Sequence, residues 1–92
     1  PAMHWRLFAT LAETAGEDRV TVEDAETVGE ALDALLSSHP ALETEVLGDD
    51  GDLVDHIRLL HEGEDPFAAA DGLETPVSGD DELALFPPVS GG

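Results

Sequence analysis

The chain has 92 residues, with 22 acidic residues against three arginines, no lysine and no cysteine, and a formal net charge of −19. Nucleic-acid binding needs a basic surface, so this composition excludes it. An anionic membrane surface would repel the chain, and no apolar run approaches the roughly 20 residues of a membrane span. Without cysteine there is no disulfide framework or thiolate metal site. We also expect no signal peptide, because no charged segment followed by an apolar one opens the chain.

The net charge is large enough to affect folding. In 0.1 M salt the repulsion among these charges amounts to about 5 kcal/mol, against the roughly 5–15 kcal/mol that stabilises a small domain. At about 1 M salt the Debye length falls to about 3 Å and the repulsion nearly vanishes. The composition therefore indicates a cytoplasmic protein of a halophile.

The chain is predicted to begin with two paired strands that are separated by one helical turn. Residues 4–10 alternate between inward apolar side chains such as Trp5 and outward ones, which indicates a strand. Residues 11–16 are typical of a helical turn that Gly16 ends. A second alternating segment at 19–23 predicts the strand that pairs with the first.

A capping box opens the clearest helix of the chain. Thr27 can accept a hydrogen bond from a free backbone N–H, and Glu30 can accept one from the Thr27 N–H. The helix is expected to end near Ser38, and Pro40 suits the first turn of a short second helix that Gly48 caps. Apolar residues recur at helical spacing at Val28, Ala31, Leu32, Leu35 and Leu36.

The second half of the chain has shorter elements. Residues 49–52 form an acidic turn, and residues 53–60 are predicted to be a third strand. We interpret residues 67–78 as a loop with a short helical or strand piece around Leu73. Residues 82–86 alternate again and predict the last strand. This order predicts an α+β fold, a mixed β-sheet packed on one main α-helix.

No internal repeat or domain boundary is visible in the sequence. Residues 1–86 are therefore expected to form one domain, and residues 87–92 a flexible tail. Pro1 and Ala2 precede Met3, and we interpret them as a cloning remnant.

The sequence predicts neither a metal site nor a catalytic apparatus. His56 and His61 are five residues apart in or near a strand, which places them on opposite faces, and no HExxH motif is present. The acidic run at 49–55 lacks the alternation of ligands, the glycine at the sixth position and the final glutamate of a calcium loop, so an acidic turn is favoured over weak cation binding. Without lysine no phosphate-binding P-loop can form. We expect no bound cofactor.

The last six residues differ from the rest of the chain because none of them is charged: Pro87, Pro88, Val89, Ser90, Gly91 and Gly92. The prolines favour an extended exit from the last strand, and glycines let a partner close tightly on the backbone. Such a tail suits delivery of the Gly92 carboxylate into another enzyme, where it can be activated as an acyl-adenylate and captured by a sulfur or nitrogen nucleophile. The alternative is a frayed terminus; the position of PPVS directly after a strand favours delivery.

Three segments carry a resemblance to a known family: RLFATLAETAG at Arg6–Gly16, TVGEALDALLSSHPALE at Thr27–Glu43 and DELALFPPVSGG at Asp81–Gly92. With them the chain resembles the small archaeal ubiquitin-like modifier proteins and the related MoaD/ThiS sulfur carriers. The resemblance implies a β-grasp (ubiquitin-like) fold and a carrier that is not itself an enzyme. The segment at 62–78 matches this family least well.

The resemblance also implies a chemistry and a set of partners. An E1-like activating enzyme would use ATP to adenylate Gly92. The product would be either an isopeptide bond to a target lysine or a thiocarboxylate, which donates sulfur for molybdopterin synthesis or tRNA thiolation. The partners would then be the activating enzyme, target-protein lysines, and the large subunit of molybdopterin synthase or a tRNA-thiolation enzyme. We expect the chain itself to be a monomer.

Aromatic residues mark the expected docking face. Phe8 and Phe86 point away from the inward residues of their strands, and an aromatic pair beside the tail is a candidate partner patch. The resemblance implies that the activating enzyme and the large synthase subunit grip this face. Phe67 is a third candidate. The alternative is that the helix or a loop covers one or both of the first two rings.

A second class of function remains open at this point. The chain could be a non-covalent β-grasp interaction module that works without terminal chemistry. Deletion of Gly91 and Gly92 discriminates the two, because an interaction module keeps its function and a carrier loses it.

Overall fold

The alternating segments of the sequence form one mixed β-sheet, and the helices cover it. The structure is a computed structural model that describes residues 2–54 and 56–87. In this part of the chain the sheet has the strand order β2-β1-β4-β3, with β1 and β4 parallel and the outer pairs antiparallel. The strands are β1 (Ala2–Leu7), β2 (Arg19–Glu23), β3 (Arg58–His61) and β4 (Glu82–Phe86).

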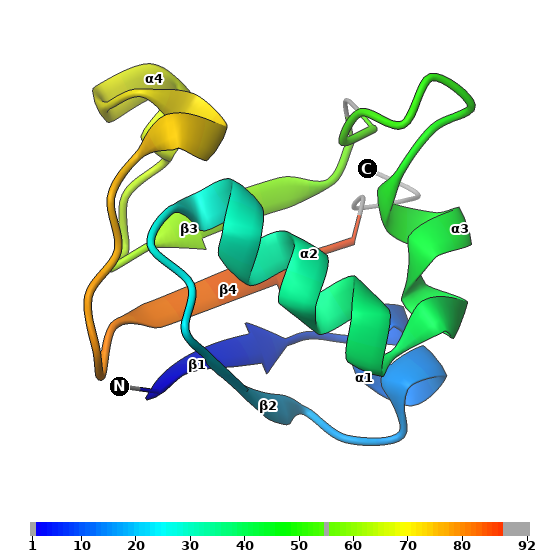
Figure 1. The fold of residues 1–92 in the computed structure, drawn as a ribbon. Coiled ribbons are helices and arrows are strands. Elements are labelled where there is room, and N and C mark those ends of the chain that lie inside the picture. The colour runs from blue at the N-terminus through cyan, green and yellow to red at the C-terminus, as the bar shows by residue number, and fades with distance from the viewer. Residues whose placement is uncertain (1, 55, 88–92) are drawn as a thin grey trace.

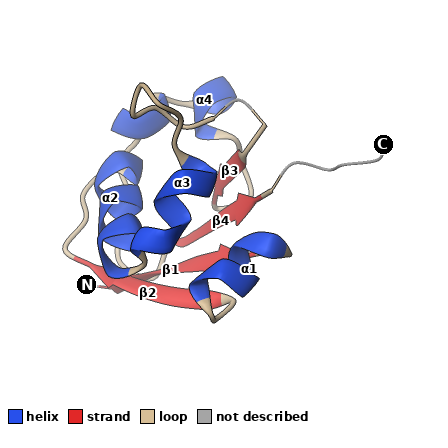
Figure 2. Ribbon diagram, turned by 90° about the vertical axis from the view of Figure 1, so that its right-hand side faces the viewer, coloured by secondary structure: helices blue, strands red, loops and turns tan. Residues whose placement is uncertain are grey.

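The main helix crosses one face of this sheet, as Figure 1 shows. The described helices are α1 (Thr10–Ala15), α2 (Val28–Ser38), α3 (Glu43–Val46) and α4 (Pro66–Ala69), with 3₁₀ turns at Pro40–Leu42 and Gly72–Glu74. α2 and α3 lie on the same side of the sheet (Figure 2). The predicted α+β architecture is confirmed. None of the described helices is long and apolar enough to cross a membrane.

The core lies between the sheet and α2, where period-2 and helical apolar patterns meet. Trp5 is fully buried, and its Nε1 donates a hydrogen bond to the Ala31 carbonyl of α2 at 3.0 Å. This bond satisfies the polar end of a large apolar side chain and ties β1 to the helix. The five α2 residues predicted to face inward are all buried.

The start of α2 confirms one half of the predicted capping box. Thr27 Oγ1 accepts a hydrogen bond from the Glu30 N–H at 3.1 Å. The Glu30 carboxylate, however, accepts from the Glu26 N–H at 2.9 Å, and not from the Thr27 N–H as predicted. The chain enters the helix beside Pro76, with which Thr27 forms an isolated β-bridge, and along this path the Glu26 amide is the one that meets the carboxylate.

The first strand is shifted relative to its prediction. β1 begins at Ala2, which pairs with Glu23 of β2, and it ends at Leu7. The predicted end at residue 10 is wrong because Ala9 adopts a φ of 52° and turns the chain into α1. Gly16 ends α1 in the left-handed conformation, as predicted.

The third strand is the largest correction. Residues 53–57 were expected to belong to it, but β3 begins at Arg58. Leu53 forms an isolated bridge with Leu47, and the Val54 N–H donates to the Val46 carbonyl at 2.9 Å. The first apolar residues of the segment therefore cover the end of α3. Only its last three residues, 58–60, pair with β4, and the strand continues one residue beyond the prediction to His61.

Two smaller predictions concern loops. Gly48 was predicted to cap the second short helix, but Leu47 is the cap, and the Gly48 N–H instead donates to the Asp52 carbonyl across the acidic turn. The helical piece expected around Leu73 is confirmed as a 3₁₀ turn.

Candidate docking site at the root of the C-terminal tail

The site lies at the end of β4, where the C-terminal tail begins. β4 ends at Phe86, and Pro87 follows it half-buried. The other predicted tail residues lie outside the described residues: Pro88, Val89, Ser90, Gly91 and Gly92. What the structure describes is therefore the surface at the root of the tail.

Phe8 and Phe86 stack on each other at this root. Their ring centroids are 4.3 Å apart and their planes differ by 11°. The parallel register that pairs Leu7 with Leu85 brings the two following residues side by side. Both rings are half-buried, while Leu7 and Leu85 are buried on the opposite face, so the predicted outward direction of both phenylalanines is confirmed. The rings cover each other, and their role in partner binding stays a prediction.

Phe67 extends this aromatic surface on the other side of Phe86. It lies on α4, is 50% exposed, and lines a groove of about 710 Å³ together with Phe86. Gly72 permits this position, because a Cβ there would lie 3.2 Å from the Phe67 ring and the residue has a φ of +61°. The other lining residues are Leu53, Val54, His56, Ile57, Arg58, Leu59, Asp65 and Pro87.

The groove is a part of the site that sequence reasoning missed. Leu53 and Val54 were predicted to be strand residues, but they leave the sheet and form one wall of the groove instead. Arg58 stands at the groove as the first residue of β3. Arg58 is one of only three arginines in a chain without lysine, and this scarcity of basic residues is the feature of the sequence that could have indicated it.

His61 has a structural contact. Its Nε2 lies 2.8 Å from Asp81 Oδ2, and the same oxygen accepts a hydrogen bond from the Ser78 N–H at 2.8 Å. The hydrogen bond from His61, assisted by that from Ser78, lowers the pKa of Asp81 below its ordinary value of 3.8, although burial opposes the shift. This contact fastens β3 to the turn before β4.

The remaining polar groups form turns. In the acidic turn, Asp50 Oδ1 accepts a hydrogen bond from the Asp52 N–H at 3.0 Å, which is the local geometry of an Asx turn. His56 is exposed in the turn before β3. Within residues 2–54 and 56–87, no group of three or more potential ligands is placed to hold a metal ion.

A mixed β2-β1-β4-β3 sheet with one main helix across its face defines a ubiquitin-like protein of the β-grasp class. The model of the ThiS family matches residues 5–92, and the chain belongs to this family. The predicted fold and the predicted family are both confirmed.

Similar proteins match this chain over nearly its whole length. The chain is 60% identical to small archaeal modifier protein 1 of Haloferax volcanii over 92 residues, which are 98% of this chain and 100% of that protein. A crystal structure of SAMP1 from the same organism matches with a TM-score of 0.89 and 54% identity, over 100% of both chains. The solution structure of SAMP1 from Methanosarcina acetivorans matches at 0.86 and 33%, over 99% of this chain and 96% of that one.

These relatives place the chain among the ubiquitin-like modifier and sulfur-carrier proteins, the class of carrier that the resemblance implied. The two surfaces that matter for such a carrier are the tail and the face of the sheet beside its root.

Proposed function

We propose that the carboxylate of Gly92 is the reacting group of this protein. A carboxylate oxygen attacks the α-phosphate of ATP in the active site of an E1-like enzyme, so that pyrophosphate leaves and an acyl-adenylate forms. A lysine amine of a target protein then displaces AMP to give an isopeptide bond, or a sulfur nucleophile displaces it on the way to a thiocarboxylate. The observation that carries this proposal is the uncharged sequence PPVSGG directly after β4, within a family match that extends to residue 92.

Chain length limits where the activating enzyme can sit. Six residues follow Phe86, and a fully extended chain covers at most about 3.6 Å per residue, or about 20 Å. An enzyme that holds the carboxylate of Gly92 must therefore come within about 20 Å of Phe86. This distance supports the stacked Phe8 and Phe86, with Phe67 in the neighbouring groove, as part of the contact surface.

ATP–pyrophosphate exchange with the purified E1-like enzyme of the same organism tests the proposal. The wild-type chain should support exchange, and a variant that lacks Gly91 and Gly92 should abolish it. A variant with one residue added after Gly92 should also be poorly active, since the carboxylate is then displaced. Exchange that persists after the deletion would contradict the proposal and favour a non-covalent interaction module.

Mass spectrometry separates the two products in the native host. A protein that carries a thiocarboxylate has one carboxyl oxygen replaced by sulfur. A conjugate carries a branch on a target lysine. Trypsin leaves an impractically long branch, because the last basic residue is Arg58, whereas cleavage after Glu82 leaves the ten residues 83–92.

The composition restricts the architecture of any conjugate. The chain contains no lysine, so it cannot form lysine-linked chains on itself and marks a target singly unless its N-terminus accepts the next copy. Detection of chains linked within this protein at any other position would contradict this.

We place this activity in the cytoplasm of a halophile, with the chain acting as a monomer. The charge of −19 supports this setting, and a relative from Haloferax volcanii is consistent with it. The free energy of unfolding should rise by about 5 kcal/mol between 0.1 M and molar KCl, as repulsion is screened. Unfolding on addition of KCl would contradict the assignment.

The later partners are proposed at the level of the family. A protein of this class that carries a thiocarboxylate would deliver sulfur to the large subunit of molybdopterin synthase or to a tRNA-thiolation enzyme, without contacting nucleic acid or a membrane itself.

A further inference from the structure

Every arginine of the chain lies on the outward face of the sheet. The strand register pairs Arg6 with Arg19 across β1 and β2, and Arg58 with Phe86 across β3 and β4. All three arginines are exposed, and they alternate along their strands with buried core residues. One face of a chain with a net charge of −19 therefore carries all of its lysine and arginine charge.

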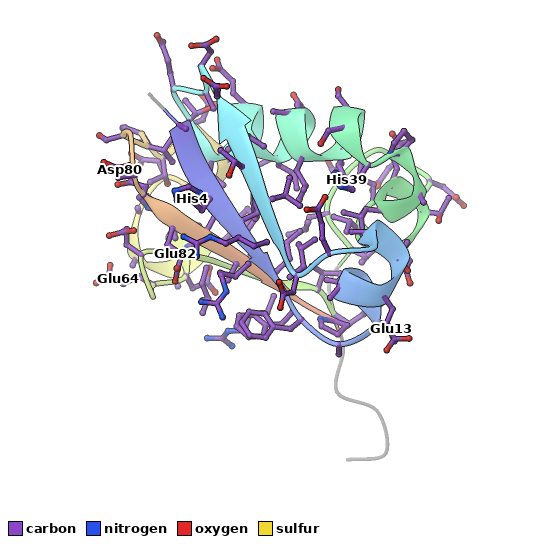
Figure 3. All side chains as sticks on the ribbon, turned by 90° about the horizontal axis from the view of Figure 1, so that it is seen from below. His4, Glu13, His39, Glu64, Asp80 and Glu82 are labelled. Carbon is purple, nitrogen blue, oxygen red and sulfur yellow. The ribbon has the colours of Figure 1, made fainter. Side chains whose placement is uncertain are left out.

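The arrangement is not one that folding stability favours. Arg6 and Arg19 are directly opposite each other, and like charges in that position destabilise a sheet. Arg6 approaches Glu82 at 3.8 Å, but both side chains are about half exposed and such a pair contributes little. Glu23 and Glu82 are the only acidic residues in the described strands, and Figure 3 shows Glu82 beside His4, its partner in the register.

Two of the three arginines, Arg6 and Arg58, flank the aromatic stack at the root of the tail. The Arg6 guanidinium lies 5.7 Å from the centre of the Phe8 ring, and Arg58 lies opposite Phe86. A partner that covers the two phenylalanines therefore meets Arg6 and Arg58 as well. Arg19 is the next outward residue beyond Arg6 toward the β2 edge.

We propose that this arginine face binds an acidic surface of the activating enzyme, with carboxylates of the enzyme on Arg6, Arg19 and Arg58 and apolar side chains on the aromatic stack. The proposal rests on the proposed function, because it takes the enzyme that activates Gly92 as the occupant. Arginine suits this role in salt, since its planar guanidinium forms short, bidentate bonds to carboxylates, whereas attraction beyond a Debye length is screened.

The acidic side chains on the helical side of the molecule also favour binding of an acidic partner at the arginine face. An acidic partner is repelled by the helical side of the chain, which carries acidic residues such as Asp33 and Glu43 and no arginine or lysine. Docking is therefore attractive in one orientation only, in which the root of the tail faces the enzyme.

Charge reversal of single arginines tests the proposal in the ATP–pyrophosphate exchange assay. Arg19→Glu and Arg58→Glu should each raise the KM for the chain about tenfold while kcat stays unchanged, because the chemistry occurs at Gly92. The control is the double variant Ser37→Glu/Thr44→Glu, which changes the net charge by the same amount at exposed positions of α2 and α3. Its KM should match that of the wild type.

Thermal unfolding in molar KCl excludes a loss of structure as the cause. Arg19→Glu places a carboxylate opposite Arg6, so its melting temperature should not fall below that of the wild type. A raised KM with undiminished stability supports the proposal.

Other outcomes overturn it. A KM for both arginine variants that equals the control would show that the enzyme does not use this face, while wild-type exchange would leave the proposed function standing. Absence of exchange with the wild type would overturn the proposed function and this inference together. A wild-type dimer that Arg19→Glu dissociates would assign the face to a second copy of the chain.

Discussion

The two faces of the single sheet are built from the same strands and differ in almost every physical property. On the inner face the apolar strand residues are all at most 5% exposed: Met3, Trp5, Leu7, Val20, Val22, Leu59, Leu83 and Leu85. On the outer face none of the described strand residues is buried, and two arginines flank a pair of stacked phenylalanine rings. The period of two along a strand thus separates the residues that hold the fold from those available to a partner.

Truncation at the centre of the inner face should have the largest effect. Trp5→Ala removes a fully buried ring and its hydrogen bond to Ala31, and should lower the free energy of unfolding by about 3–5 kcal/mol. Urea unfolding in molar KCl measures this change. Arg6→Ala, at the next residue on the outer face, is the control and should change stability by less than about 1 kcal/mol. Equal costs at the two positions would show that the faces do not differ in the way described.

Truncation on the outer face should affect binding more than stability. Phe86→Ala removes the stacked pair, which is half-buried and should cost about 1 kcal/mol of stability. The KM of the chain in ATP–pyrophosphate exchange should rise about tenfold, since a central aromatic anchor is lost. Phe86→Leu keeps apolar volume, so its KM should lie between those of the wild type and Phe86→Ala. An unchanged KM for Phe86→Ala would remove Phe86 from the docking surface.

The smallest effect is expected at the turn that leads into β4. The pKa of Asp81 is lowered in the folded protein, chiefly by its hydrogen bond to His61, so its carboxylate stabilises the fold above the unfolded pKa near 3.8. This contribution is lost as the pH falls through the lowered folded pKa. Asp81→Asn should therefore cost about 1 kcal/mol at pH 7 and progressively less below pH 4, as urea unfolding across this range measures. A difference that is constant with pH would show that the charge of Asp81 has no part in it.

Much of this division of faces is predictable from the sequence, where the pattern is strictly periodic. The boundaries of β2, α2 and β4 agree with the alternation at 19–23 and 82–86 and with the helical spacing after Thr27. The outward directions of Phe8 and Phe86 follow from the same alternation. Their stacking does not, because it requires the parallel pairing of β1 with β4, which lie more than 70 residues apart in sequence.

The errors arise where tertiary contacts override the local pattern. Residues 53–60 alternate like one strand, yet Leu53 and Val54 bond to the end of α3 and leave the sheet. Ala9 continues the apolar alternation of the first strand, yet it has a φ of 52°. A positive φ is uncommon for alanine, so the sequence does not predict the turn at this position. The groove that joins Phe67 to Phe86 depends on both the shortened β3 and the position of α4, so the sequence alone could not show it.

The burial of Trp5 has a spectroscopic consequence. It is the only tryptophan, and the chain has no tyrosine, so one indole on the inner face dominates the near-ultraviolet absorption and intrinsic fluorescence of the whole protein. Its emission should be blue-shifted while the domain is folded and should move to the red on unfolding. A protein that binds the opposite face of the sheet should leave the environment of Trp5 largely unchanged. The tryptophan emission should therefore respond to unfolding and change little when a partner binds.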